Sequence, residues 1–212
     1  MIENFNIGIL EFYHNLADVA GDLFTPLAKA MTFIGEGGVW LYILAGILFC
    51  FTKTRKMGVC LFGAVCCGAL ISNLILKDLV ALPRPYESGI EELRAWWVAA
   101  GGIKEESFSF PSGHATAAAA GMTALALIWN KKILWFGVPY VTLMCAARNY
   151  LIAHYPTDVL AGACIGVVSA IIAYFITLGI YAFLEKFPDW FFSRWVLTDI
   201  DAGKLFKGKK DD

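Results

Sequence analysis

The chain has 212 residues, of which 58% are hydrophobic and only 17% are charged, whereas an ordinary soluble domain has about a quarter charged residues. A formal net charge of −1 argues against a nucleic-acid partner, because DNA- and RNA-binding domains carry a clear basic excess. The charges collect between long apolar runs, which is typical of polytopic membrane proteins. The sequence therefore predicts an all-α membrane helix bundle that forms a single domain over residues 1–212.

The first 35 residues mix apolar and acidic positions, so residues 1–35 are expected to form an interfacial amphipathic helix or a partly spanning segment. Residues 20–34 are the candidate for an additional, poorly hydrophobic span. Five further stretches are apolar enough to approach the roughly 20 residues that cross a bilayer; they cover residues 37–52, 57–76, 111–130, 133–153 and 159–184. We therefore expect five to six transmembrane helices, together with interfacial helices.

The cysteines all lie inside apolar stretches, which indicates small buried hydrophobic side chains and neither a disulfide framework nor a zinc site. They are Cys50, Cys60, Cys66, Cys67, Cys145 and Cys164.

Basic residues in short loops predict the orientation, because such loops stay on the cytoplasmic side. The connections after the first and third spans contain Lys and Arg, and so does the segment after the last span. Residues 186–212, which also contain four aromatic residues between 190 and 195, are therefore expected to form a cytoplasmic interfacial tail. The acidic N-terminal segment and the long loop 77–110 then lie on the opposite, extracytoplasmic side.

Polar residues that are unusual in a membrane protein occur where predicted spans begin or end. In an alternating trace, these ends of the second to fifth spans all meet at one membrane face. The residues are Lys77, Arg84, Ser112, Gly113, His114, Arg148, His154 and Asp158. Because charged groups are costly near lipid, such a gathering predicts a functional site.

The chemistry of these side chains favours a phosphate ligand. Three cations suit an anion with two or more charges, and Arg can bind phosphate oxygens in a bidentate manner. Ser112 and Gly113 lie where a helix begins, and a helix N-terminus is a natural phosphate site. Histidines supply proton transfer near neutral pH, and Asp158 could hold one ring nitrogen of His154 so that the other attacks phosphorus.

Each residue alone also has a structural interpretation. Lys77 could extend its charge to the membrane interface, Ser112 could only cap a helix, and His154 with Asp158 could form a structural pair. Together, the residues favour a site. A transporter of anions or lipid phosphates is the alternative from another class, but transport needs no paired histidines, and no internal repeat is visible.

Three motifs carry a resemblance to a known family. The segments KDLVALPRP, PSGH and ARNYLIAHYPTD resemble the motifs of the type-2 phosphatidic acid phosphatase superfamily, except that Ala147 stands where the family usually has Ser. The resemblance implies that His154 is a nucleophile that forms a phosphohistidine, oriented by Asp158, and that His114 protonates the leaving group. It implies phosphate binding by Lys77, Arg84, Arg148, Ser112 and Gly113, with no metal and no cofactor.

The resemblance also suggests a substrate and a place in the cell. The chain is similar to bacterial undecaprenyl diphosphate phosphatases, and phosphatidylglycerophosphate, phosphatidic acid and lipid A phosphate are the alternative substrates. This similarity implies a protein of the bacterial cytoplasmic membrane with an extracytoplasmic active site. The expected partners are a lipid phosphate substrate and membrane lipids, without an obligate protein partner.

Overall fold

The computed structural model describes residues 2–199, and every regular element among them is a helix. The α-helices are α1 (Ile2–Gly35), α2 (Val39–Phe49), α3 (Arg55–Ala69), α4 (Lys77–Val80), α5 (Glu91–Ala99), α6 (Gly113–Ile128), α7 (Leu134–Tyr150), α8 (Pro156–Lys186) and α9 (Phe191–Arg194). Short 3₁₀ or π-helical segments are η1 (Glu36–Gly38), η2 (Leu70–Leu76), η3 (Pro85–Glu87), η4 (Lys131–Ile133) and η5 (Trp195–Asp199). The predicted all-α class is therefore confirmed.

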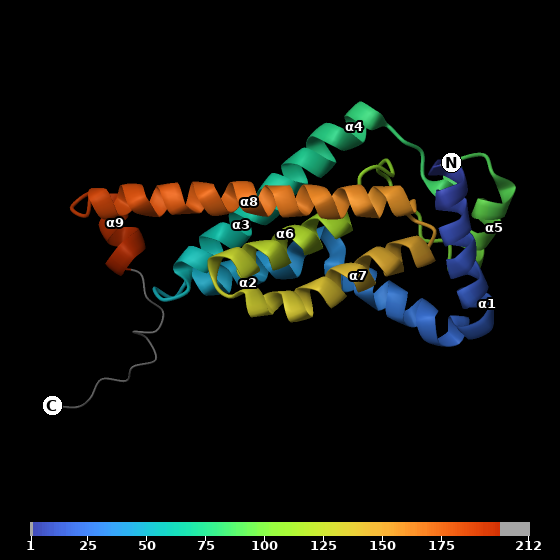
Figure 1. Ribbon diagram of the computed structural model, residues 1–212, viewed down its shortest axis with the longest axis horizontal. Coiled ribbons are helices and arrows are strands. Elements are labelled where there is room, and N and C mark those ends of the chain that lie inside the picture. The colour runs from blue at the N-terminus through green and yellow to red at the C-terminus, as the bar shows by residue number, and fades with distance from the viewer. Residues whose placement is uncertain (1, 200–212) are drawn as a thin grey trace.

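Within residues 2–199, three helical stretches are long and apolar enough to cross a membrane: Ile2–Phe49, Arg55–Glu87 and Pro156–Lys186. Helix α6 is apolar but shorter. The helices α2, α3, α6, α7 and α8 run roughly along the long axis of the molecule (Figure 1). Large apolar side chains such as Trp135 and Phe175 point outward, as expected for a surface that contacts lipid. The chain is thus a polytopic helical membrane protein.

Helix α1 changes direction in its middle. Ala20 has non-helical backbone angles (φ −142°, ψ 31°), so residues 2–19 lie across one end of the bundle, and the rest of α1 leads toward α2 (Figure 1). The first half is fixed to the start of α8 by a reciprocal pair of hydrogen bonds. Asn6 Nδ2 donates to Thr157 Oγ1 at 3.1 Å, and Thr157 N donates to Asn6 Oδ1 at 3.2 Å.

The most extensive helix contact within residues 2–199 joins α6 to α8 and includes small residues. A Cβ atom at Gly162 would lie 2.5 Å from the Ser112 carbonyl oxygen, and one at Gly166 would lie 2.4 Å from the Thr116 carbonyl oxygen. These two glycines are four residues apart and share one face of α8, so the helix backbones can approach closely. The contact holds the beginnings of α6 and α8 together, and both beginnings carry predicted site residues.

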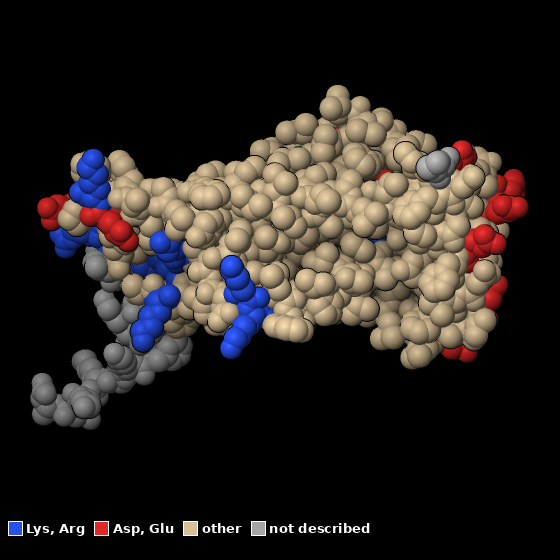
Figure 2. Space-filling view, in the orientation of Figure 1, with Lys and Arg blue, Asp and Glu red and all other residues tan. Residues whose placement is uncertain are grey.

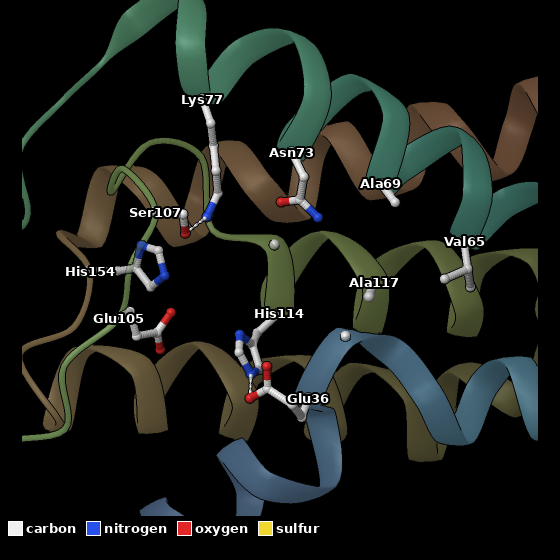
Figure 3. A pocket seen from close by; sticks show the side chains of 12 residues that line it. Glu36, Val65, Ala69, Asn73, Lys77, Glu105, Ser107, His114, Ala117 and His154 are labelled. Atoms are coloured by element: carbon white, nitrogen blue, oxygen red, sulfur yellow. Dashed lines mark hydrogen bonds and ion pairs between the residues drawn. The ribbon is translucent and has the colours of Figure 1, made fainter.

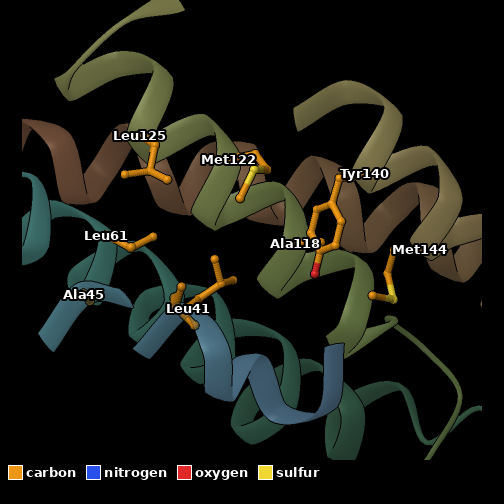
Figure 4. Close-up of a cluster of buried hydrophobic side chains, with 9 residues drawn as sticks. Leu41, Ala45, Leu61, Ala118, Met122, Leu125, Tyr140 and Met144 are labelled. Carbon is orange, nitrogen blue, oxygen red and sulfur yellow. The ribbon is translucent and has the colours of Figure 1, made fainter. Parts of the chain in front are cut away.

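A second cluster of buried side chains joins α2, α3, α6 and α7 (Figure 4). Leu41 and Leu61 face Met122 of α6, and Met144 and Tyr140 come from α7. The cluster also satisfies its polar atoms, because Trp40 Nε1 donates to Tyr140 Oη at 3.0 Å. It packs the helices that surround the site against each other.

The sequence predicted that all six cysteines are buried, but their environments differ. Cys60 is buried, but Cys50 and Cys164 are exposed and the other three are partly exposed. The prediction is therefore wrong for five of the six. In a membrane bundle, apolar residues also cover the outer surface, so apolar neighbours in the sequence do not indicate burial.

Charged side chains gather toward the two ends of the molecule, and few appear on the middle of the face shown in Figure 2. Basic side chains occur mainly at the end that carries α9, and acidic ones at the end that carries α5 and the N-terminal half of α1. The predicted tail 186–212 begins at the basic end with exposed Trp190, Phe191 and Phe192. Its part from residue 200 onward lies outside the described residues.

Candidate active site

The predicted site residues meet where α4, the start of α6 and the connection from α7 to α8 come together. A cavity of about 230 Å³ lies at this point (Figure 3). Of the eight predicted residues, Lys77, Gly113, His114 and His154 line the cavity. The other four are almost completely buried and do not line it: Arg84, Ser112, Arg148 and Asp158.

Arg84 is held by backbone groups from two loops. The chain leaves α4 through Ala81 in the left-handed conformation (φ 48°), and Pro85 then starts η3. Arg84 Nε donates to the Ser107 carbonyl oxygen at 2.7 Å, and Nη1 donates to the Ala153 carbonyl oxygen at 2.8 Å. The guanidinium therefore connects the loop before α6 to the loop before α8.

The neighbours of His154 define its reactive form. Its Nε2 lies 3.4 Å from Arg84 Nη1. Because a guanidinium can only donate, Nε2 must be the acceptor, and the proton of the neutral ring belongs on Nδ1. Burial lowers the pKa of His154 well below 6.5, and Arg148, Arg84 and Lys77 lower it further. The ring is thus a neutral imidazole with its lone pair on Nε2.

Asp158 holds His154 less directly than the sequence suggested. The distance from Asp158 Oδ2 to His154 Nδ1 is 3.8 Å, which is too long for a hydrogen bond. Oδ2 instead accepts the Ser109 hydroxyl at 2.6 Å and the Tyr155 N–H at 2.9 Å. Asp158 is the third residue of α8, where a carboxylate naturally accepts from the backbone N–H before the helix.

His114 lies in the first turn of α6 and faces the cavity from the side opposite Lys77 (Figure 3). Its Nε2 is buried and makes no hydrogen bond within residues 2–199; the nearest carboxylate oxygen is Glu36 Oε2, at 3.5 Å. The backbone of Thr32 lies beside the ring. This nitrogen is therefore available to a group bound in the cavity.

Ser112 and Gly113 make the start of α6 compact. The Ser112 hydroxyl accepts from the Ala115 N–H at 3.5 Å, so this side chain serves as the helix cap that the sequence had allowed as an alternative. A Cβ atom at Gly113 would lie 2.8 Å from Asn73 Oδ1. Glycine at this position lets η2 approach the start of α6, and Gly113 lines the cavity.

Lys77 points into the site and does not extend to a membrane interface. Its Nζ donates to Ser107 Oγ at 2.7 Å, and the residue is only 8% exposed. The wider π-helical segment η2 directly precedes it; such segments inside helices are frequent at functional sites.

Glu105 is the site residue that sequence reasoning missed. Its Oε2 accepts from Arg84 Nη2 at 3.0 Å, and its Oε1 accepts from Arg148 Nη2. Burial alone would raise the pKa of Glu105, but Arg148 and Arg84 outweigh this effect, so the pKa lies below its ordinary value. In the sequence, Glu105 stands in a charged loop beside Lys104 and Glu106, and nothing there distinguishes it from a solvent-exposed residue.

The assembled groups suit the transfer of a phosphoryl group. A neutral imidazole supplies a nucleophile, a second imidazole stands across the cavity, and three cations with a helix N-terminus supply positive potential. All eight residues predicted from the sequence lie in or directly behind one cavity, between Lys77 and Asp158 along the chain.

Comparisons with known proteins agree with this arrangement. The family model described as the PAP2 superfamily matches residues 57–180. An undecaprenyl-diphosphatase of Sulfolobus acidocaldarius is 28% identical over 165 residues, which cover 76% of this chain and 73% of that protein.

Solved structures show the same fold. The crystal structure of Aquifex aeolicus LpxE has a TM-score of 0.58 and 26% identity, covering 77% of this chain and 93% of that one. The structure of the first transmembrane PAP2 type phosphatidylglycerolphosphate phosphatase from Bacillus subtilis has a TM-score of 0.52 and 23% identity, with 84% and 93% covered. Because the family model matches more than half of the chain and includes every predicted site residue, this chain belongs to the PAP2 superfamily and is a membrane lipid phosphatase.

Proposed function

We propose that the protein hydrolyses a lipid phosphate or diphosphate through a phosphohistidine on His154, without a metal ion. The observation that carries this proposal is the state of His154. The residue lines the cavity, and its Nε2 has a lone pair and stands beside the guanidinium of Arg84, which could hold a phosphate oxygen. A nucleophile next to a phosphate-binding cation is the arrangement that covalent phosphoryl transfer requires.

In the first step, His154 Nε2 forms a bond to phosphorus while the bond from phosphorus to the leaving oxygen breaks. His114 Nε2 donates its proton to that oxygen, so the lipid alcohol or lipid phosphate departs. Lys77, Arg84 and Arg148 stabilise the charge that develops on the phosphoryl oxygens.

In the second step, water attacks the phosphohistidine. The neutral His114 takes a proton from this water, and the bond between phosphorus and His154 breaks, which releases inorganic phosphate. Asp158 stays ionised and favours the proton on His154 Nδ1, although the present separation of 3.8 Å requires the two groups to approach in the reacting complex.

The cavity walls support a lipid substrate. Away from the cations, small or apolar residues line the cavity: Gly37, Val65, Ala69 and Ala117 (Figure 3). This wall leads between α3 and α6 toward the apolar middle of the bundle, so a hydrocarbon chain could follow it into the membrane. Undecaprenyl diphosphate is the preferred substrate because of the Sulfolobus relative. Phosphatidylglycerophosphate, phosphatidic acid and lipid A phosphate remain the alternatives.

We further propose that the helices cross the membrane five or six times as a single domain, with α1 contributing the additional crossing or lying at the interface. The separation of charges in Figure 2 supports a cytoplasmic side at the α9 end. The active site then faces the extracytoplasmic side of a bacterial cytoplasmic membrane.

The test uses the purified full-length protein in detergent with excess chelator. Phosphate release is measured from the four lipids for the wild type and for His154→Ala and His114→Ala. His14→Ala is the matched control, because His14 is the third histidine and stacks on Trp96 outside the cavity. Release by the wild type and the control, with none from His154→Ala, supports the mechanism, and the ranking of lipids names the substrate.

Persistent release by His154→Ala would contradict the proposal. Lipid or phosphate flux across reconstituted vesicles without any hydrolysis would instead favour the transporter alternative.

A further inference from the structure

We propose that Glu36 is a positioning residue that favours a proton on His114 Nε2, the nitrogen that gives this proton to the leaving oxygen when substrate is bound. The inference rests on the proposed function, because it concerns the acid of that reaction. It assigns a role to a residue that lies far from the three sequence motifs.

The geometry is that of a carboxylate and an imidazole at the edge of one cavity. Glu36 Oε2 lies 3.5 Å from His114 Nε2 (Figure 3). The imidazole side chain is 9% exposed and the carboxylate side chain 71% exposed. Both residues line the cavity. Glu36 thus connects a buried ring to the open side of the site.

The backbone fixes Glu36 in this place. Gly35, just before it, packs so closely that a Cβ atom there would lie 2.3 Å from Met144 Cε and 3.2 Å from His114 Cδ2. After Glu36, Gly37 and Gly38 adopt the left-handed conformation (φ 55° and 69°), which is readily open only to glycine. This turn therefore passes directly over the His114 ring.

The charges around His114 disfavour a proton on its ring, so a carboxylate beside the ring would offset them. The charged or titratable groups that face it from the surrounding elements are Lys77, Glu105, Arg148, His154 and Glu36. The two cations oppose a further positive charge on the ring. Glu105 is already neutralised by two guanidinium groups. Within the described residues, the ion pairs of Glu36 are limited to that with His114.

The chemistry of leaving groups makes this role measurable. An alkoxide is strongly basic, so a phosphate monoester of an alcohol needs a proton donor when its bond to phosphorus breaks. Nitrophenolate is a stable anion and needs little help. A residue that sustains the acid should therefore matter for the first class of substrate and much less for the second.

The experiment compares the wild type with Glu36→Gln, Glu36→Asp and Glu11→Gln, an exposed acidic position on α1 away from the cavity. Values of kcat and KM are measured against pH with phosphatidic acid and with p-nitrophenyl phosphate. Glu36→Gln should lower kcat on phosphatidic acid about 10- to 100-fold, within the range for general acid catalysis. On p-nitrophenyl phosphate, we expect a change below about threefold.

The pH profile gives a second readout. In Glu36→Gln, the alkaline limb on phosphatidic acid should move to lower pH, because the ring loses its proton more readily without the carboxylate. Glu36→Asp should restore most of the profile, and Glu11→Gln should match the wild type. Equal losses on both substrates, or no loss on phosphatidic acid, would overturn the inference. Hydrolysis that persists in His154→Ala would instead overturn the proposed function.

Discussion

Replacing Glu105 with Gln tests whether a bound phosphate displaces the Glu105 carboxylate from Arg84 and Arg148. Arg84 has five N–H groups, and its contacts occupy all of them. The acceptors are Ser107 O, Ala153 O, His154 Nε2, Glu105 Oε2, Ser107 Oγ and, at 3.5 Å, Phe108 O. Phosphate can therefore bind the guanidinium only if one of these partners leaves. Glu105 is the partner with the same charge as the substrate, and its side chain is 22% exposed.

The structure sets the size of the effect. Removing one partner of a buried ion pair costs about 3–5 kcal/mol. Glu105 is partly exposed and Gln keeps one oxygen acceptor, so we expect roughly 1.5–3 kcal/mol less stability without ligand. The wild type must break the same contacts to admit phosphate. If breaking these contacts costs the wild type about 1.4–2.8 kcal/mol, Glu105→Gln should bind phosphate about 10- to 100-fold more tightly than the wild type.

The assay measures inhibition of p-nitrophenyl phosphate hydrolysis by inorganic phosphate, together with Tm in detergent with and without phosphate. Glu106→Gln is the matched control, because Glu106 is adjacent, acidic and exposed. Without phosphate, we expect a lower Tm for Glu105→Gln than for the wild type. Added phosphate should raise the Tm of Glu105→Gln by more than it raises the Tm of the wild type. An inhibition constant that is unchanged or weaker in Glu105→Gln would refute the reasoning and indicate that the carboxylate only orients the arginines.

Three further results are expected. Gly166→Ala should lower the free energy of unfolding by about 1–3 kcal/mol, because the added Cβ meets the α6 backbone. The control Gly179→Ala, whose Cβ would have nothing within 4 Å, should be neutral or stabilising. Thermal unfolding measures both variants, and equal effects would contradict the close contact. The acid limb of kcat/KM should lie well below pH 6.5, since the lowered pKa of His154 keeps its ring neutral as pH falls; a limb at or above 6.5 would count against His154 as the nucleophile. Ser109→Ala should lower stability by about 1–3 kcal/mol and reduce kcat, because Asp158 loses a buried hydrogen bond of 2.6 Å; an unchanged Tm would show that water replaces the hydroxyl.

The sequence was sufficient for features that depend on local pattern. Each predicted span contains one main helix, such as α8 for residues 159–184, because long apolar runs must satisfy their backbone groups within a helix. Alternation of the spans then placed His114 and His154 at one cavity. Spacing along the chain thus determined which residues meet.

Features that depend on side-chain packing between distant segments were not predictable. Glu105 and Glu36 stand among ordinary acidic residues, and their roles arise only when α6 and α7 bring His114 and Arg148 to them. Likewise, the competition of Ser109 for Asp158 depends on how the loop before α6 folds. Loop side chains are selected by tertiary contacts, which leave no periodic signal in one sequence.

The bonds between Asn6 and Thr157 bear on how the protein is made. The two residues are 151 positions apart, so the ribosome must synthesise the first 157 of the 212 residues before Asn6 can meet its partner. Until then, the side chain of Asn6, which is buried in the finished fold, has to remain in contact with water or headgroups. An amphipathic helix that lies on the membrane surface can keep this side chain in such contact. The start of α8 beside Asp158 therefore gains these two bonds only late in synthesis, after the site residues before it have been made.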